Sequence, residues 1–85
     1  EFIFSAHFYY FLLLLVTSRM LALAGAKIKQ LREEKEIDQK SFAFDCEIGR
    51  TQLYMIEKGR TNPRLLTLIK IADGLEISIS ELLKI

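Results

Sequence analysis

The sequence predicts an all-α domain, a compact bundle of five short helices preceded by an apolar N-terminal segment that we also expect to be helical. Three observations favour this fold class. Apolar residues recur at helical spacing from Lys27 onward, capping residues stand between the periodic runs, and no later run alternates long enough for a strand. A chain of 85 residues can bury one modest core, so we expect a single folded domain.

The chain changes character near Gly25, and we divide it there into an apolar leader, residues 1–25, and a helical domain, residues 26–85. Three interpretations of the leader remain open. It can be an extension added by cloning or by the reading frame, with Met20 as the natural start, or a helix that packs on the domain or on a partner. The third interpretation, a membrane anchor through residues 2–18, is the least favoured.

The first two helices of the domain are expected at residues 27–35 and 39–46. Asp38 is a good N-cap for the second, because its carboxylate can accept a hydrogen bond from a free backbone N–H in the first turn. The first helix carries one face with helical spacing: Ile28, Leu31 and Arg32. The inward positions expected in the second helix are Phe42, Ala43 and Cys46.

Three more helices follow. The third is expected at residues 50–58, and Gly59 suits the left-handed residue that ends it. The fourth is expected at residues 64–73, and a short fifth helix takes Ser78 or Ser80 as its cap. The positions expected to face the core in the third and fourth helices are Leu53, Ile56, Leu65, Leu68, Ile69 and Ala72.

Composition argues against several functions. The chain has one cysteine, Cys46, and one histidine, His7, so it can form no internal disulfide and no four-ligand zinc site. No glycine-rich phosphate loop follows a strand, and no paired carboxylates mark a pocket. We therefore expect no catalytic residues, no cofactor and no metal site, and we expect Cys46 to be a small buried apolar residue.

Polar residues crowd the start of the third helix, which a plain helical bundle does not explain. Arg50, Thr51 and Gln52 lie in its first turn, and Met55 lies one turn later on the same outward face. Arginine can pair with guanine, glutamine with adenine, and threonine or methionine can contact a thymine methyl group. The formal net charge is only +1, but four basic residues and one acid between positions 50 and 64 can form a basic face.

Residues 28–83 resemble the phage repressor and Cro family of helix-turn-helix domains, also called the xenobiotic response element type, which has the lambda-repressor fold. The matching stretches are IKQLREEKEIDQKSFA, IGRTQLYMIEKGRTNP and LLTLIKIADGLEISISELL. The resemblance implies a bacterial or phage transcriptional regulator, and a cytoplasmic location fits a chain whose single cysteine demands no oxidising compartment. We expect a repressor that binds double-stranded DNA sequence-specifically and reads the major groove with helix 50–58.

The resemblance also implies roles for single residues. Arg50, Thr51 and Met55 fall where the family reads base edges, while Gln52 and Tyr54 flank them and can contact bases or phosphates. We therefore take the base-reading set to be Arg50, Thr51, Gln52 and Met55.

Other positions match the family's contacts to the DNA backbone. Gln39 begins the second helix, where the family has a glutamine that clamps the backbone and where a helix N-terminus favours phosphate. Arg32 matches an arginine that pairs with the glutamate of the recognition helix, so we expect a structural Arg32–Glu57 salt bridge, at least partly buried. The further backbone candidates are Lys40, Lys58, Arg60, Asn62 and Arg64.

A single domain of this size makes a small interface with DNA, so we expect a homodimer on a near-palindromic operator. Its half-sites should lie roughly 34 Å apart, or a multiple of that. The dimer contact is expected either at the C-terminal helix, around Ile79, Leu82 and Leu83, or at the apolar leader. Two alternatives use the same fold: an antitoxin-like protein-interaction module and a membrane-tethered one.

Overall fold

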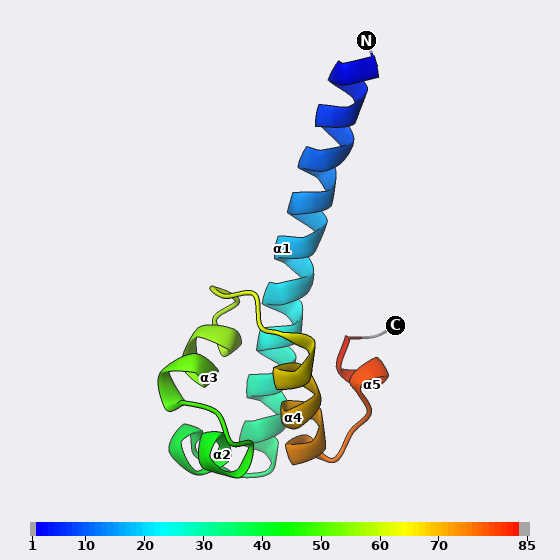
Figure 1. Ribbon diagram of the computed structural model, residues 1–85. Coiled ribbons are helices and arrows are strands. Elements are labelled where there is room, and N and C mark those ends of the chain that lie inside the picture. Colours follow the sequence, from blue (N-terminus) through cyan, green and yellow to red (C-terminus); the bar gives the residue numbers. More distant parts are fainter. Residues whose placement is uncertain (1, 84–85) are drawn as a thin grey trace.

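The computed structural model describes residues 2–83, except for the side chains of residues 2–5, 11 and 14–17. Its helices are α1 (Phe2–Glu34), α2 (Gln39–Asp45), α3 (Arg50–Glu57), α4 (Leu65–Leu75) and α5 (Ile79–Leu83). No strand occurs within residues 2–83, and the predicted all-α fold class is confirmed. The C-terminal half of α1 lies among the four shorter helices, whereas its N-terminal half projects from the bundle (Figure 1).

The helix expected at residues 27–35 is the last part of a much longer helix, because α1 runs through Gly25 without a break. Gly25 serves packing rather than helix termination. A Cβ atom added there would overlap the carbonyl oxygen of Ile56 and lie 2.9 Å from that of Glu57. The missing side chain therefore lets α1 approach the C-terminal end of α3.

A single apolar core joins all five helices. The inward positions expected in α2 and α3 are confirmed, and Cys46 is buried, which raises the pKa of its thiol to about 11. The prediction for α4 was wrong at Leu65 and Ile69, which are 62% and 37% exposed. Apolar residues occur on every side of this helix, so periodicity alone does not select its buried face. That face consists of Leu68, Ile71, Ala72 and Leu75.

Four of the helices end in the same way. The backbone N–H of the residue that follows the left-handed position bonds to a carbonyl five residues earlier, as from Ile48 to Ala43 at 3.0 Å. Gly59, with φ 70°, fills the left-handed position after α3 as predicted. Glutamates fill it after α1, α2 and α4, with φ values of 58°, 59° and 60°: Glu36, Glu47 and Glu76.

Two side-chain caps begin helices. The Asp38 carboxylate accepts a hydrogen bond from the Ser41 N–H at 2.7 Å, which confirms the predicted N-cap of α2. This hydrogen bond holds the pKa of Asp38 below its usual value. Ser78, rather than Ser80, caps α5, because its hydroxyl accepts from the Glu81 N–H at 3.0 Å.

The last helix completes the core of its own chain. Leu82 is 2% exposed, and Ile79 and Leu83 pack against the same core. The dimer contact expected at these three residues is therefore wrong for Leu82, whose side chain is already buried within the domain. Among the residues that the structure describes in full, which leave out 2–5, 11 and 14–17 of α1, we find no helix with the length and hydrophobicity needed to cross a lipid bilayer.

Candidate DNA interface

The unit that presents the expected binding residues consists of α2, a tight turn and α3. The turn covers residues 46–49, with Glu47 in the left-handed conformation and Ile48 half-buried against the core. Ala43, which is 2% exposed, is a small residue in the core beside this turn. The turn changes the direction of the chain, and α3 lies along the side of the bundle (Figure 1).

The two sides of α3 differ sharply. Leu53, Ile56 and Glu57 are buried. On the other side, the three polar residues at the start of the helix are all exposed, and one apolar residue a turn later is half-buried. These are the expected base-reading residues: Arg50, Thr51, Gln52 and Met55.

The N-terminal end of α3 has no side-chain cap. Gly49 is the N-cap and supplies no side-chain hydrogen bond, so the first backbone N–H groups of α3 are not capped by that residue. Further along, Tyr54 is 42% exposed, and the Lys58 ammonium lies 5.6 Å from the centre of its ring. A cation over an aromatic face is attracted to it, which places the Lys58 charge near the far end of the exposed side.

A buried ion pair holds α3 to α1. Arg32 donates two hydrogen bonds to the Glu57 carboxylate, from Nε to Oε2 at 2.7 Å and from Nη2 to Oε1 at 3.1 Å. Both side chains are almost fully buried, 8% and 2% exposed. The hydrogen bond to Glu57 raises the pKa of Arg32, so the guanidinium stays charged. The expected Arg32–Glu57 pair is thus present, in the bidentate geometry that fixes both groups.

Two further groups join this pair, and no pattern in the sequence indicated either contact. Arg32 Nη1 donates to the Ile37 carbonyl at 2.8 Å, and Gln39 Nε2 donates to Glu57 Oε1 at 2.9 Å. The network therefore connects α1, the loop after it, α2 and α3. Because a primary amide has two N–H donors, the Gln39 side chain keeps one after binding Glu57.

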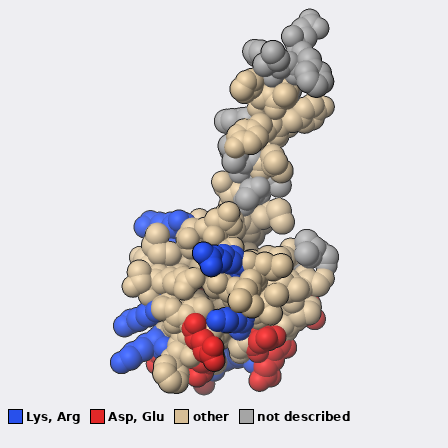
Figure 2. All heavy atoms as spheres, in the orientation of Figure 1, with Lys and Arg blue, Asp and Glu red and all other residues tan. Residues whose placement is uncertain are grey.

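Positive charge is spread along the side of the domain formed by α2, α3 and the loop after α3. Figure 2 shows basic side chains along that edge and acidic side chains gathered toward the lower end of the domain. All five basic residues expected to contact DNA are exposed, as is the one asparagine: Lys40, Arg50, Lys58, Arg60, Arg64 and Asn62.

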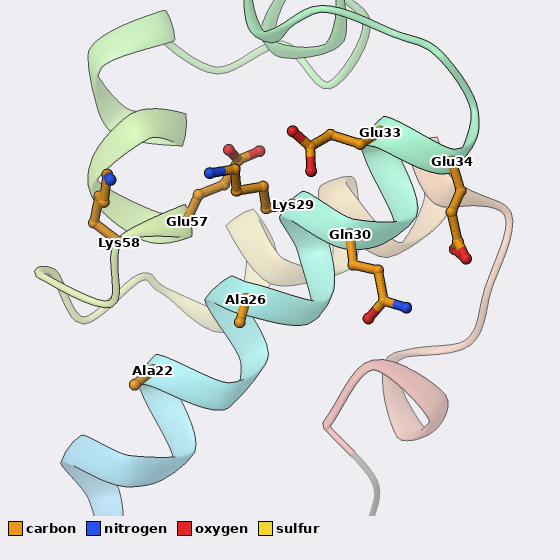
Figure 3. Close-up of a pocket in the computed structure, with 8 residues that line it drawn as sticks. All are labelled: Ala22, Ala26, Lys29, Gln30, Glu33, Glu34, Glu57 and Lys58. Atoms are coloured by element: carbon orange, nitrogen blue, oxygen red, sulfur yellow. The ribbon is translucent and has the colours of Figure 1, made fainter.

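A groove of about 810 Å³ lies between α1 and the end of α3 (Figure 3). Ala22 and Ala26 form its floor on α1, while Lys29, Glu33 and Lys58 bring charges of both signs to its walls. None of the expected base-reading residues lines it. With acidic side chains on its wall, the groove is a poor site for phosphate, although Lys58, one of the expected backbone contacts, also lines it.

A core-anchored helix with a polar exposed start, joined by a tight turn to the helix before it, defines a helix-turn-helix domain. The family model described as "Helix-turn-helix" matches residues 28–82. The chain belongs to this family, in its Cro/C1-type branch, and is a DNA-binding transcription regulator.

Similar proteins include control proteins and repressors. The control protein C.MunI of Mycoplasma sp is 46% identical over 59 residues, which cover 68% of this chain and 80% of that protein. The immunity repressor of Bacillus phage phi105 is 38% identical over 56 residues, or 66% of this chain and 39% of the repressor. The crystal structure of the restriction-modification controller protein C.AhdI from Aeromonas hydrophila superposes with a TM-score of 0.70 at 31% identity, covering 73% of this chain and 94% of that one.

Proposed function

We propose that the protein is a repressor that binds a near-palindromic operator as a homodimer, with the exposed side of α3 in the major groove. The observation that carries this proposal is the contrast between the two sides of α3. Arg50, Thr51 and Gln52 are exposed at its start, while Leu53 and Glu57 anchor its other side in the core. A helix that is rigidly held and polar outward can present side chains to base edges at fixed positions.

We assign base reading to Arg50, Thr51, Gln52 and Met55. Arg50 can form two hydrogen bonds with guanine, and Gln52 can do so with adenine. Thr51 and Met55 offer apolar contact to a thymine methyl group, and Met55 is half-buried, so only part of its side chain reaches outward.

We assign backbone contacts to the polar residues around α3. Gln39 is half-buried, and its bond to Glu57 holds its side chain beside α3, with one amide N–H left for a phosphate oxygen. The others are exposed and would neutralise or bond phosphates directly. They are Lys40, Lys58, Arg60, Asn62 and Arg64.

The homodimer follows from the size of the interface. One domain offers a small contact with DNA, and two copies on half-sites roughly 34 Å apart double it. The role is regulatory rather than enzymatic, and we place it in the cytoplasm, where the operator is.

Replacing Arg50 with alanine tests the base-reading assignment. We expect Arg50→Ala to weaken binding to the preferred site by about 1–3 kcal/mol and to relax the preference at one base pair of each half-site, because one bidentate contact is lost. Selection from random double-stranded DNA with the parent chain and the variant measures both effects. An unchanged selection profile would contradict the assignment.

Arg60→Ala tests the backbone contacts and serves as the control for Arg50→Ala. It should weaken binding to all sequences about equally and lower the slope of log affinity against log salt by about one, because one phosphate contact is lost. Arg60 is a cleaner test than Gln39, whose side chain also bonds Glu57. An altered base preference, or a salt slope equal to that of the parent chain, would show that Arg60 does not act through phosphate.

A further inference from the structure

A stripe of large apolar side chains runs along the projecting half of α1 and continues to the edge of the bundle. Tyr9, Leu13, Met20 and Leu23 are 71%, 62%, 45% and 70% exposed. Their spacings of four, seven and three residues place them on one side of an α-helix, at the a and d positions of a heptad pattern. The stripe is about 21 Å long at 1.5 Å per residue.

The sequence on the other sides of the helix does not continue in this way. Ser18, Arg19 and Ala22 interrupt them with polar or small side chains, whereas the stripe keeps a large apolar residue as far as Leu23. Heptad spacing is the pattern by which one helix packs along another. The stripe therefore fits a helical partner better than a flat or irregular one.

The stripe is next to a second apolar feature. A groove of about 540 Å³ lies between α1 and α5, and its lining includes the apolar residues Met20, Leu23 and Leu83 beside polar ones such as Gln30 and Glu34. Apolar surface thus extends from the projecting helix onto the domain. Large apolar side chains exposed together on a folded protein mark an interaction site.

The near absence of charged residues on this part of α1 favours an equally uncharged helix as its partner. From residue 6 to residue 26 the helix carries a single charged residue, Arg19. A strongly acidic or basic partner would lose hydration along the stripe and find no complementary row of charges. A second copy brings an equally neutral stripe, and the same surface on both copies makes the self-complementary contact of a two-fold dimer.

We propose that α1 of one copy packs along α1 of a second copy through the stripe formed by Tyr9, Leu13, Met20 and Leu23. This inference rests on the proposed function in one respect, since it supplies the contact for the proposed homodimer. It makes the projecting half of α1 the dimerisation element, while α2 and α3 remain the DNA-binding element.

Two adjacent tyrosines provide a matched test. Tyr9 is in the stripe, and Tyr10, 63% exposed, lies about 100° around the helix from it. Tyr9→Asp and Tyr10→Asp make the same chemical change on the same helix. Sedimentation equilibrium of the full chain without DNA should show a dimer whose dissociation constant rises at least tenfold in Tyr9→Asp and less than twofold in Tyr10→Asp.

A second variant, Leu23→Asp, places the charge at the other end of the stripe and should weaken the dimer by a similar factor. Circular dichroism of each variant shows whether the helices remain. The proposal is overturned if Tyr9→Asp and Tyr10→Asp have equal effects, or if the parent chain is monomeric throughout the concentration range.

The outcome is separable from that of the proposed function. If random-sequence selection gives a clear operator while the dimer ignores Tyr9→Asp, the stripe proposal fails and DNA recognition stands. If the dimer depends on Tyr9 but selection gives no preferred sequence, the stripe proposal stands and the proposed function fails.

Discussion

Glu57→Ala is expected to lower the free energy of unfolding by about 3–5 kcal/mol, because it leaves a buried guanidinium without its counter-ion. Arg32 is 6% exposed and gives two of its hydrogen bonds to Glu57. For a domain of this size the midpoint of thermal unfolding should fall by more than about 10 °C. Chemical denaturation of the full chain, followed by circular dichroism, measures the loss.

The surface pair Lys35–Glu76 supplies the control. Its atoms are 3.9 Å apart, and the two side chains are 37% and 83% exposed. Lys35→Ala should change stability by less than about 0.5 kcal/mol, because solvent screens exposed pairs. Replacing both buried partners, as in Arg32→Met with Glu57→Leu, should recover much of the stability lost in Glu57→Ala. Equal losses of stability in Lys35→Ala and Glu57→Ala would show that burial does not determine how much the Arg32–Glu57 pair contributes to the free energy of unfolding.

The loss also bears on recognition. Glu57 joins α3 to Arg32 of α1 and to Gln39 of α2, so its removal loosens the placement of α3 relative to both. The proposed base reading by Arg50 and its neighbours requires that α3 be held in a fixed position. The buried hydrogen-bond network around Glu57 therefore holds α3 in place and so fixes the positions of its exposed side chains.

The parts of the fold that depend on local signals were predictable from sequence. Helical periodicity gave the inward residues of α2 and α3, and Asp38 and Gly59 marked a helix start and a helix end. Helix ends without glycine were harder. Glu36, Glu47 and Glu76 adopt the left-handed conformation that glycine usually fills, and nothing in their side chains signals it.

Features that depend on distant contacts were the ones missed. The buried face of α4 is chosen by its neighbours, since the helix is apolar on every side. Leu82 belongs to the core rather than to a dimer contact because α5 folds back onto its own chain. At the DNA-binding surface, the family resemblance indicated the Arg32–Glu57 pair. It did not indicate the hydrogen bond from Gln39, which depends on how α2 lies against α3.

Gly25 is the clearest case of a position whose role depends on distant contacts and could not be predicted from local sequence. A glycine after an apolar run predicts a break, and here it lies within a continuous helix. The reason is its contact with Ile56 and Glu57, more than thirty residues later in the chain. Only the folded arrangement of α1 and α3 shows that position 25 has no room for a side chain.

Gly25→Ala is therefore expected to destabilise the protein by about 1–3 kcal/mol, the usual cost of overpacking a tight contact. Helix propensity alone predicts the opposite sign, a gain of about 1 kcal/mol, because alanine loses less backbone entropy than glycine in a helix. The added methyl group would meet backbone carbonyl oxygens, which cannot rotate away as the end of a flexible side chain could. Chemical denaturation of the full chain decides between the two signs.

The neighbouring residue calibrates this measurement. Ala26 is exposed on the same helix, so Ala26→Gly should cost about 1 kcal/mol through propensity alone. If Gly25→Ala is more stable than the parent chain while Ala26→Gly behaves as expected, α1 does not approach the end of α3 as closely as the structure has it. If Gly25→Ala is destabilised, α1 is packed directly against α3, and a shift in α1 must also shift the exposed residues of α3 that we propose to contact DNA.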